Sequence, residues 1–170
     1  MHATAFLVLL GSGLCLYLPS LAELVGRRPL LKTIHLCTAV AWAAAIVVIV
    51  VFGDRRALRA TVREIDRLDS SRLNVGQKLN AIVTAAFAIL FAISGFFLWY
   101  GERDTRFRLP AALLVHDWLM DVSLVLFAGH LFLSLIYPRT RHALSGMTRG
   151  WVDEEWALEH HRKWAEESRR

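Results

Sequence analysis

The sequence has few of the residues that disulfide bonding, zinc binding or hydrolytic catalysis would need. Its 170 residues include two cysteines, Cys15 and Cys37, and neither has a C-x-x-C partner. Both fall in apolar stretches, where a cysteine usually acts as a small packing residue. No nucleophile–base pair, phosphate-binding loop, internal repeat or low-complexity tract is recognisable. Hydrolysis or group transfer by this chain alone is therefore not expected.

Charge is also missing from long stretches. Asp, Glu and Arg are absent from residues 33–52 and 79–100, and 55% of the chain is hydrophobic. A helix of about 20 apolar residues crosses a hydrocarbon core of roughly 30 Å. Four apolar blocks have about that length or more: residues 3–25, 29–53, 78–101 and 109–137. The sequence thus predicts an all-α membrane protein with a four-transmembrane-helix bundle over residues 1–137.

The formal net charge is +5, and the basic residues are most numerous in two segments. Residues 54–78 and the segment after Tyr137 carry seven Lys or Arg each, whereas the connections 27–32 and 103–108 share six. This distribution indicates a membrane topology, not nucleic-acid binding. The positive-inside rule places the richer side in the cytoplasm. We expect a multi-pass protein of a bacterial inner membrane with both termini cytoplasmic.

A charged segment joins the second and third predicted spans. Its apolar residues recur at helical spacing, which favours a short amphipathic helix on the cytoplasmic surface. These residues are Leu58, Val62, Ile65 and Leu68.

Residues 138–170 are predicted to form a cytoplasmic tail, because Pro138 should end the fourth span. Three tryptophans lie there among charged residues, as in segments that lie at a membrane interface or dock a partner. They are Trp151, Trp156 and Trp164. The adjacent His160 and His161 point in different directions on a helix, so surface positions are favoured over metal binding.

Three histidines fall within predicted spans, where ionisable side chains are rare and usually functional. His116 and His130 are fourteen residues apart, a rise of about 21 Å on nearly the same helix face. That spacing suits one ligand to each of two stacked cofactors. His35 lies at a depth similar to that of His116, so these two imidazoles can bind one haem iron from opposite faces. The alternative is a set of hydrogen-bonded interior histidines.

Small residues accompany these positions. Glycines in the spans would let a flat macrocycle or another helix approach the backbone, although ordinary packing between membrane helices also uses them. The glycines are Gly11, Gly13, Gly95 and Gly129.

The whole chain resembles the four-helix, di-haem cytochrome b (gamma) subunit of membrane-bound formate dehydrogenases. The matching motifs run from the first span to the tail: "GSGLCLYLP", "TIHLCTAV", "NVGQKL", "LLVHDWL", "GHLFLSLI" and "GWVDEEWALEHHRKW". Cytochrome b subunits of thiosulfate reductases and some hydrogenases are near relatives. The resemblance implies that electrons enter from an iron–sulfur subunit of a complex with a catalytic subunit, cross two b haems and reduce a quinone.

The resemblance also implies roles for single residues. His35 and His116 match the ligands of the outer haem, and His130 matches one ligand of the inner haem. Asn74, Gly76 and Gln77 match the segment that forms the quinone pocket with the inner haem ligand. Asn and Gln amides can hydrogen-bond quinone oxygens. A helix N-cap is the alternative role for Asn74.

The start of the chain departs from the family pattern. That pattern has a histidine followed by an alanine, a phenylalanine and a glycine at intervals that Ala3, Phe6 and Gly13 satisfy. The histidine would then precede Met1, and His2 stands about three residues too late. We expect the second inner-haem ligand to lie upstream of this start. Otherwise His2 replaces it, or the inner haem is absent.

Two other classes of function compete with electron transfer. A haem-free membrane anchor would tether a soluble oxidoreductase without needing histidines at paired depths. A transporter or channel tends to use intramembrane carboxylates or repeated halves. Asp117 and Asp121 are the only candidate carboxylates and lie near the end of a span.

Overall fold

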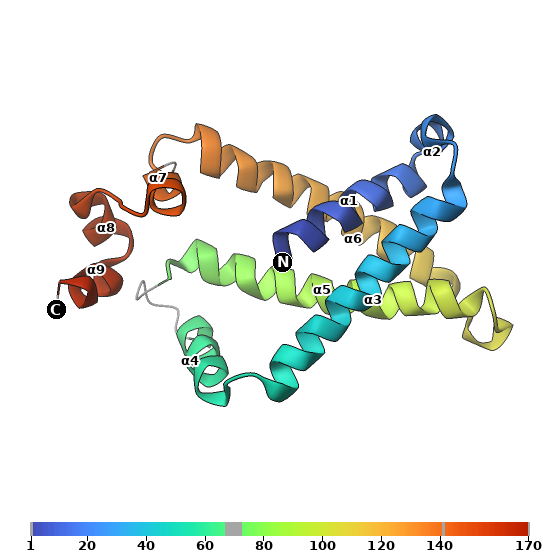
Figure 1. Ribbon diagram of the computed structural model, residues 1–170, viewed down its shortest axis with the longest axis horizontal. Helices are drawn as coiled ribbons and strands as arrows, with labels where there is room; N and C mark the ends of the chain where they lie inside the picture. Colours follow the sequence, from blue (N-terminus) through green and yellow to red (C-terminus); the bar gives the residue numbers. More distant parts are fainter. Residues whose placement is uncertain (1, 67–72, 141, 170) are drawn as a thin grey trace. The chain divides into compact units, whose positions relative to one another are not determined.

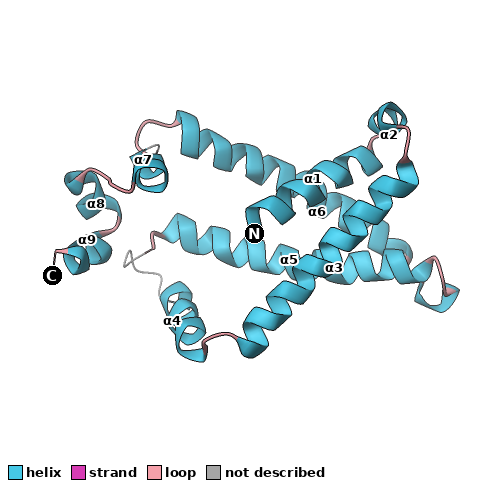
Figure 2. Cartoon of the chain, in the orientation of Figure 1, coloured by secondary structure: helices cyan, strands magenta, loops and turns pink. Residues whose placement is uncertain are grey.

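The computed structural model describes residues 2–66, 73–140 and 142–169, and within these ranges the ordered elements are all helices (Figure 2). The prediction of an all-α protein is therefore confirmed for the described chain. The chain divides into two compact units. The first comprises Met1–Asp54 and Phe87–Leu124, and the second comprises Arg55–Ala86 and Val125–Arg170. Two long helices, α5 (Val75–Gly101) and α6 (Pro110–Leu131), contribute to both units (Figure 1).

The first apolar block folds as two helices instead of one. Helix α1 (His2–Tyr17) and helix α2 (Pro19–Val25) meet at a bend of 106°. The cause is Pro19, which lacks an N–H and keeps the preceding residue out of the helical region. Leu18 accordingly has an extended backbone with φ −93° and ψ 110°. By itself α1 is about 24 Å long, shorter than the hydrocarbon core.

Three other helices have the length and composition to cross a membrane: α3 (Arg28–Phe52), α5, and α6 continued by the π-helical turn η2 (Phe132–Ile136). The bent pair of α1 and α2 is a fourth span if it counts as one. Tyr137 ends the last span with an extended backbone immediately before Pro138, as predicted. Many Val, Leu and Ile side chains of these helices are exposed, as lipid contact requires.

The connection between α5 and α6 is held by aromatic packing. Tyr100 stacks on Phe96 at 5.5 Å and meets the edge of Phe107 at 4.9 Å. Asp104 caps the short helix η1 (Thr105–Phe107) by accepting a hydrogen bond from the Arg106 N–H. The Arg106 guanidinium also bonds this carboxylate and lowers the pKa of Asp104. The turn thereby joins the end of α5 to the start of α6.

Helix α4 (Arg55–Asp66) confirms the helical part of the amphipathic prediction. Leu58 and Ile65 are half-buried, Val62 is exposed, and Leu68 lies outside the described residues. The second unit also buries Lys78, which is 1% exposed. Its Nζ lies 3.9 Å from Glu64 Oε1, so a carboxylate of α4 accompanies a buried ammonium of α5.

The tail forms three short helices, α7 (His142–Arg149), α8 (Glu154–His160) and α9 (Arg162–Ser168). Trp156 fixes this part of the second unit, because its indole N–H donates to the Arg139 carbonyl at 2.6 Å. Its ring stacks on His160 at 4.7 Å. Trp151 and Trp164 are exposed. The predicted roles of the tail at a membrane surface or partner stay predictions.

Candidate functional site

The structure brings His35 of α3 and His116 of α6 together in the first unit. Their ring centroids lie 6.3 Å apart, and the ring planes differ by 69°. Both residues are half-buried. Their similar depth in two spans predicted that these histidines lie close together, and the structure shows that they do. The two residues are 81 positions apart in the sequence (116 − 35).

A buried serine of α1 holds the His35 ring. Ser12 Oγ lies 2.9 Å from His35 Nδ1 and 2.6 Å from the carbonyl oxygen of Val8, one turn earlier on α1. A hydroxyl has a single hydrogen to donate, and the shorter contact with the carbonyl takes it. The serine oxygen is left as an acceptor, so His35 Nδ1 carries the hydrogen and His35 Nε2 presents a lone pair.

The same arrangement recurs at His116. Ser94 Oγ of α5 lies 2.9 Å from His116 Nδ1 and 2.7 Å from the Leu90 carbonyl oxygen. The same reasoning leaves His116 Nε2 with a lone pair. The edge of the Phe91 ring also packs against this imidazole, with centroids 5.0 Å apart. Two serines that the sequence analysis missed therefore fix the orientation of two predicted ligands.

Two of the four glycines adjoin these imidazoles. A Cβ at Gly13 would lie 3.4 Å from His35 Cε1, and one at Gly95 would lie 3.4 Å from His116 Cε1. Gly11 and Gly129 have no neighbour within 4 Å of the corresponding position. Gly13 and Gly95 therefore lie against the two imidazoles, and the prediction that glycines admit a macrocycle stays a prediction.

The separation of the two rings fits axial coordination of one metal ion. A histidine nitrogen binds a metal at about 2 Å, and bonds of about 1.33 Å give an imidazole a radius of about 1.1 Å. Two rings on opposite sides of one ion would thus have centroids about 6.2 Å apart, against the observed 6.3 Å. No group of three or more His, Cys, Asp or Glu side chains suited to a metal occurs in the described chain. A haem needs only axial ligands from protein, so the pair suffices.

The other predicted ligands have different surroundings. His130 is exposed on the part of α6 that belongs to the second unit, and its Nε2 lies 3.5 Å from Ser134 Oγ. Among the described residues of that unit, no second imidazole contacts it. His2 belongs to the first unit, where the Trp42 indole N–H donates to His2 Nδ1 at 2.9 Å.

The predicted quinone segment opens α5. Asn74 Oδ1 accepts the Gln77 N–H at 2.9 Å, and Gln77 Oε1 accepts the Asn74 N–H at 3.1 Å. This reciprocal pair is a capping box that satisfies two backbone donors at a helix start. Gly76 lies between them, and a Cβ there would be 3.4 Å from Asn74 Oδ1. The N-cap role of Asn74 is thus confirmed, while its side-chain NH₂ and that of Gln77 are left to donate to a ligand.

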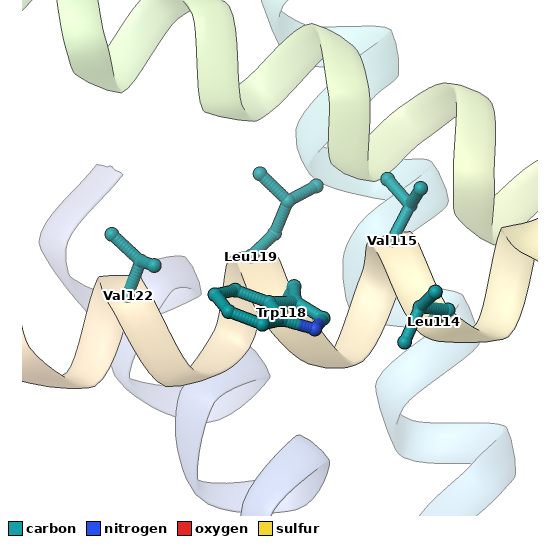
Figure 3. A pocket seen from close by; sticks show the side chains of 5 residues that line it. All are labelled: Leu114, Val115, Trp118, Leu119 and Val122. Carbon is teal, nitrogen blue, oxygen red and sulfur yellow. The ribbon is translucent and has the colours of Figure 1, made fainter.

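An apolar groove of about 330 Å³ follows one face of α6 (Figure 3). The figure shows the Trp118 indole lying between smaller aliphatic side chains. The lining residues are Leu114, Val115, Trp118, Leu119 and Val122. None of them is titratable, so the groove suits hydrocarbon instead of a polar substrate and contributes no group to the imidazole pair.

The fold has the long apolar helices of a multi-pass membrane protein, and its two neighbouring imidazoles could hold a haem. Residues 1–150 match the family model of prokaryotic cytochrome b561. The chain belongs to this family, a family of membrane cytochromes that bind haem b and transfer electrons.

Curated relatives agree with this assignment. The chain is 26% identical over 188 aligned positions to the cytochrome b556(fdo) subunit of formate dehydrogenase from Escherichia coli strain K12, with 98% of this chain and 87% of that protein covered. It is also 26% identical over 102 positions to the formate dehydrogenase cytochrome b556 subunit of Haemophilus influenzae, covering 58% and 42%. The resemblance to formate dehydrogenase cytochrome b subunits is therefore confirmed. No solved structure gives a match.

Proposed function

We propose that this chain is the haem b subunit of a respiratory oxidoreductase of the formate dehydrogenase type. It passes electrons from an iron–sulfur subunit, associated with a catalytic subunit, across a bacterial inner membrane to quinone. The observation that carries the proposal is the separation of 6.3 Å between the His35 and His116 rings. A haem-free anchor has no need of two imidazoles at that separation.

In this proposal, His35 and His116 would hold the outer haem through their ring nitrogens. Each ring keeps Nε2 available, because its Nδ1 is bonded to a serine. A haem b held there supplies one-electron redox chemistry. Gly13 and Gly95 adjoin the edges of the two rings.

In this proposal, His130 would supply one ligand of an inner haem, and a residue other than His2 would supply the second. His2 is a weak candidate, because the Trp42 indole donates to its Nδ1. A neutral imidazole that accepts at Nδ1 carries its hydrogen on Nε2 and has no lone pair left for iron. A di-haem chain in this family therefore needs another donor for the inner iron.

Asn74, Gly76 and Gln77 form the quinone segment of the proposal. The capping box uses the amide oxygens of Asn74 and Gln77, and their NH₂ groups are the type of donor that a quinone oxygen accepts. The seven basic residues of the segment 54–78 and the seven of the tail support the part of the proposal in which this segment and both termini face the cytoplasm.

A reduced-minus-oxidised spectrum of the full-length protein, with iron counted per chain, tests the proposal. We expect a b-type spectrum whose amplitude falls in both His35→Ala and His116→Ala. His142→Ala is the matched control, because His142 is exposed in α7. A colourless wild-type protein, or an unchanged spectrum in both span variants, would refute the haem assignment. Formate-dependent quinone reduction by membranes that contain the complex tests the type of partner.

A further inference from the structure

The first unit contains the same hydroxyl–imidazole pair twice. Each pair consists of a Ser-Gly dipeptide on one helix and a histidine further along the chain, Ser12 with His35 and Ser94 with His116. The intervals are 23 and 22 residues, and both oxygen–nitrogen distances are 2.9 Å. In both cases the serine also bonds the carbonyl oxygen four residues earlier on its own helix.

Both serines are buried, so water does not compete for these hydrogen bonds. Ser12 is 8% exposed and Ser94 is 4% exposed, and each sits next to the glycine that adjoins the same imidazole. The backbone carbonyl takes the hydroxyl hydrogen, so the serine oxygen faces the ring as an acceptor. A ring that donates from Nδ1 to a fixed acceptor cannot rotate freely or exchange its tautomer.

We propose that Ser12 and Ser94 are positioning residues that together orient His35 and His116 as axial ligands and set the redox balance of the iron between them. Each hydroxyl accepts the Nδ1–H of its histidine, and this makes the opposite nitrogen a stronger donor. A stronger nitrogen donor stabilises the ferric form more than the ferrous form. This inference rests on the proposed haem site.

The test is a graded series at each serine in the full-length haem-loaded protein. Alanine removes the acceptor, cysteine has nearly the size of serine but accepts weakly, and threonine keeps a hydroxyl. We expect Ser12→Ala and Ser94→Ala to raise the midpoint potential, by about 59 mV for a tenfold loss of ferric preference. They should also weaken haem retention 10- to 100-fold, measured as transfer to excess apomyoglobin.

The cysteine variants should lie between alanine and wild type, threonine should restore most of the effect, and the double alanine variant should shift furthest. Ser123→Ala is the control, because Ser123 is also 8% exposed and bonds no imidazole among the described residues. If an alanine variant does not assemble, the cysteine variant, whose side chain is nearly the size of serine, decides the question.

Different results would refute the proposed haem site and the proposed role of the serines. If His35→Ala and His116→Ala leave the haem spectrum intact, the haem assignment itself is wrong. If those variants lose the spectrum but the serine series behaves like Ser123→Ala in potential and haem retention, the haem assignment stands and the role of the serines is refuted.

Discussion

The two units of the chain hold their histidines in different ways. In the first unit, the His35 and His116 rings are 6.3 Å apart, and each bonds a buried serine through Nδ1. In the second unit, His130 is exposed and lies 3.5 Å from the hydroxyl of Ser134 on its own helix. All three histidines lie within apolar helices, so this position alone makes each of them an equally good candidate for a haem ligand. The difference is the hydrogen-bond partner of the ring. A buried serine bonded to Nδ1 fixes the orientation of His35 and of His116, whereas His130 has no such buried partner among the described residues.

A bulky residue at Gly95 should have the largest effect on the first unit. A Cβ there already reaches 3.4 Å from His116 Cε1, so the branches of Gly95→Val must displace the imidazole. Overpacking of about 1–3 kcal/mol corresponds to roughly tenfold or hundredfold weaker haem binding, measured by haem titration. Gly11→Val should bind haem like the wild type, because Gly11 has no neighbour within 4 Å. Equal losses in both variants would show that valine harms these helices regardless of the imidazole.

The second unit should prove more sensitive than the first to loss of the carboxylate that pairs with a lysine. Lys78 is 1% exposed and Nζ lies 3.9 Å from Glu64 Oε1, whereas Lys32 pairs with Glu102 at an exposed position of the first unit. Removing one partner of a buried pair costs about 3 kcal/mol, whereas an exposed pair contributes about 1 kcal/mol at most.

Unfolding of the purified chain in mixed micelles measures this contrast. Glu64→Gln should lower the free energy of unfolding by the larger amount, because the buried Lys78 ammonium then loses the negative charge of this carboxylate. Glu102→Gln should change it little. A similar loss in both variants would indicate that burial of Lys78 is not what makes its pair important.

Asn74 offers a way to separate helix capping from quinone binding. Asp caps helices as well as Asn does, so Asn74→Asp should keep the stability of α5 while it removes the NH₂ donor. Asn74→Ala should lose about 1 kcal/mol of stability as well. We expect quinone reduction to fall about tenfold in Asn74→Asp, the value of one hydrogen bond. Normal quinone turnover in Asn74→Asp would restrict this residue to its capping role.

The smallest predicted effect concerns Asp104 in the connection between α5 and α6. Arg106 lowers its pKa below the ordinary 3.8. A carboxyl group with a lowered pKa in the folded state stabilises that state fully above pH 3.8, and the contribution disappears as the pH falls through the folded value. Thermal unfolding between pH 3 and 5 should therefore be slightly less pH-dependent in Asp104→Asn. An identical dependence in both proteins would show that the Arg106 contact does not contribute.

Much of the helical framework was predictable, but one break was not predicted. The apolar runs indicated α3, α5 and α6, and Pro138 indicated the end of the last span. The first block was predicted as a single span, although Pro19 interrupts it and turns the chain by 106°. Hydrophobicity reports the tendency to enter lipid, whereas the bend depends on one missing N–H and one excluded backbone conformation.

The sequence predicted the two histidines of the candidate site but not the serines that bond them. His35 and His116 stood out because ionisable side chains are rare within apolar runs. Ser12 and Ser94 did not, because serine is common between membrane helices. The repeated interval from a Ser-Gly dipeptide to a histidine was the available signal, but two short matches are too few to recognise as a repeat in a sequence.

The sequence by itself determined that the chain forms long apolar helices and that histidines lie within them, because a backbone in hydrocarbon must satisfy its polar groups within helices or closed barrels. Only the tertiary structure decided which helices bring their histidines together and which serine bonds each ring. Those contacts join residues 22 or more positions apart. They depend on the rotation and register of separate helices, which local propensity does not fix.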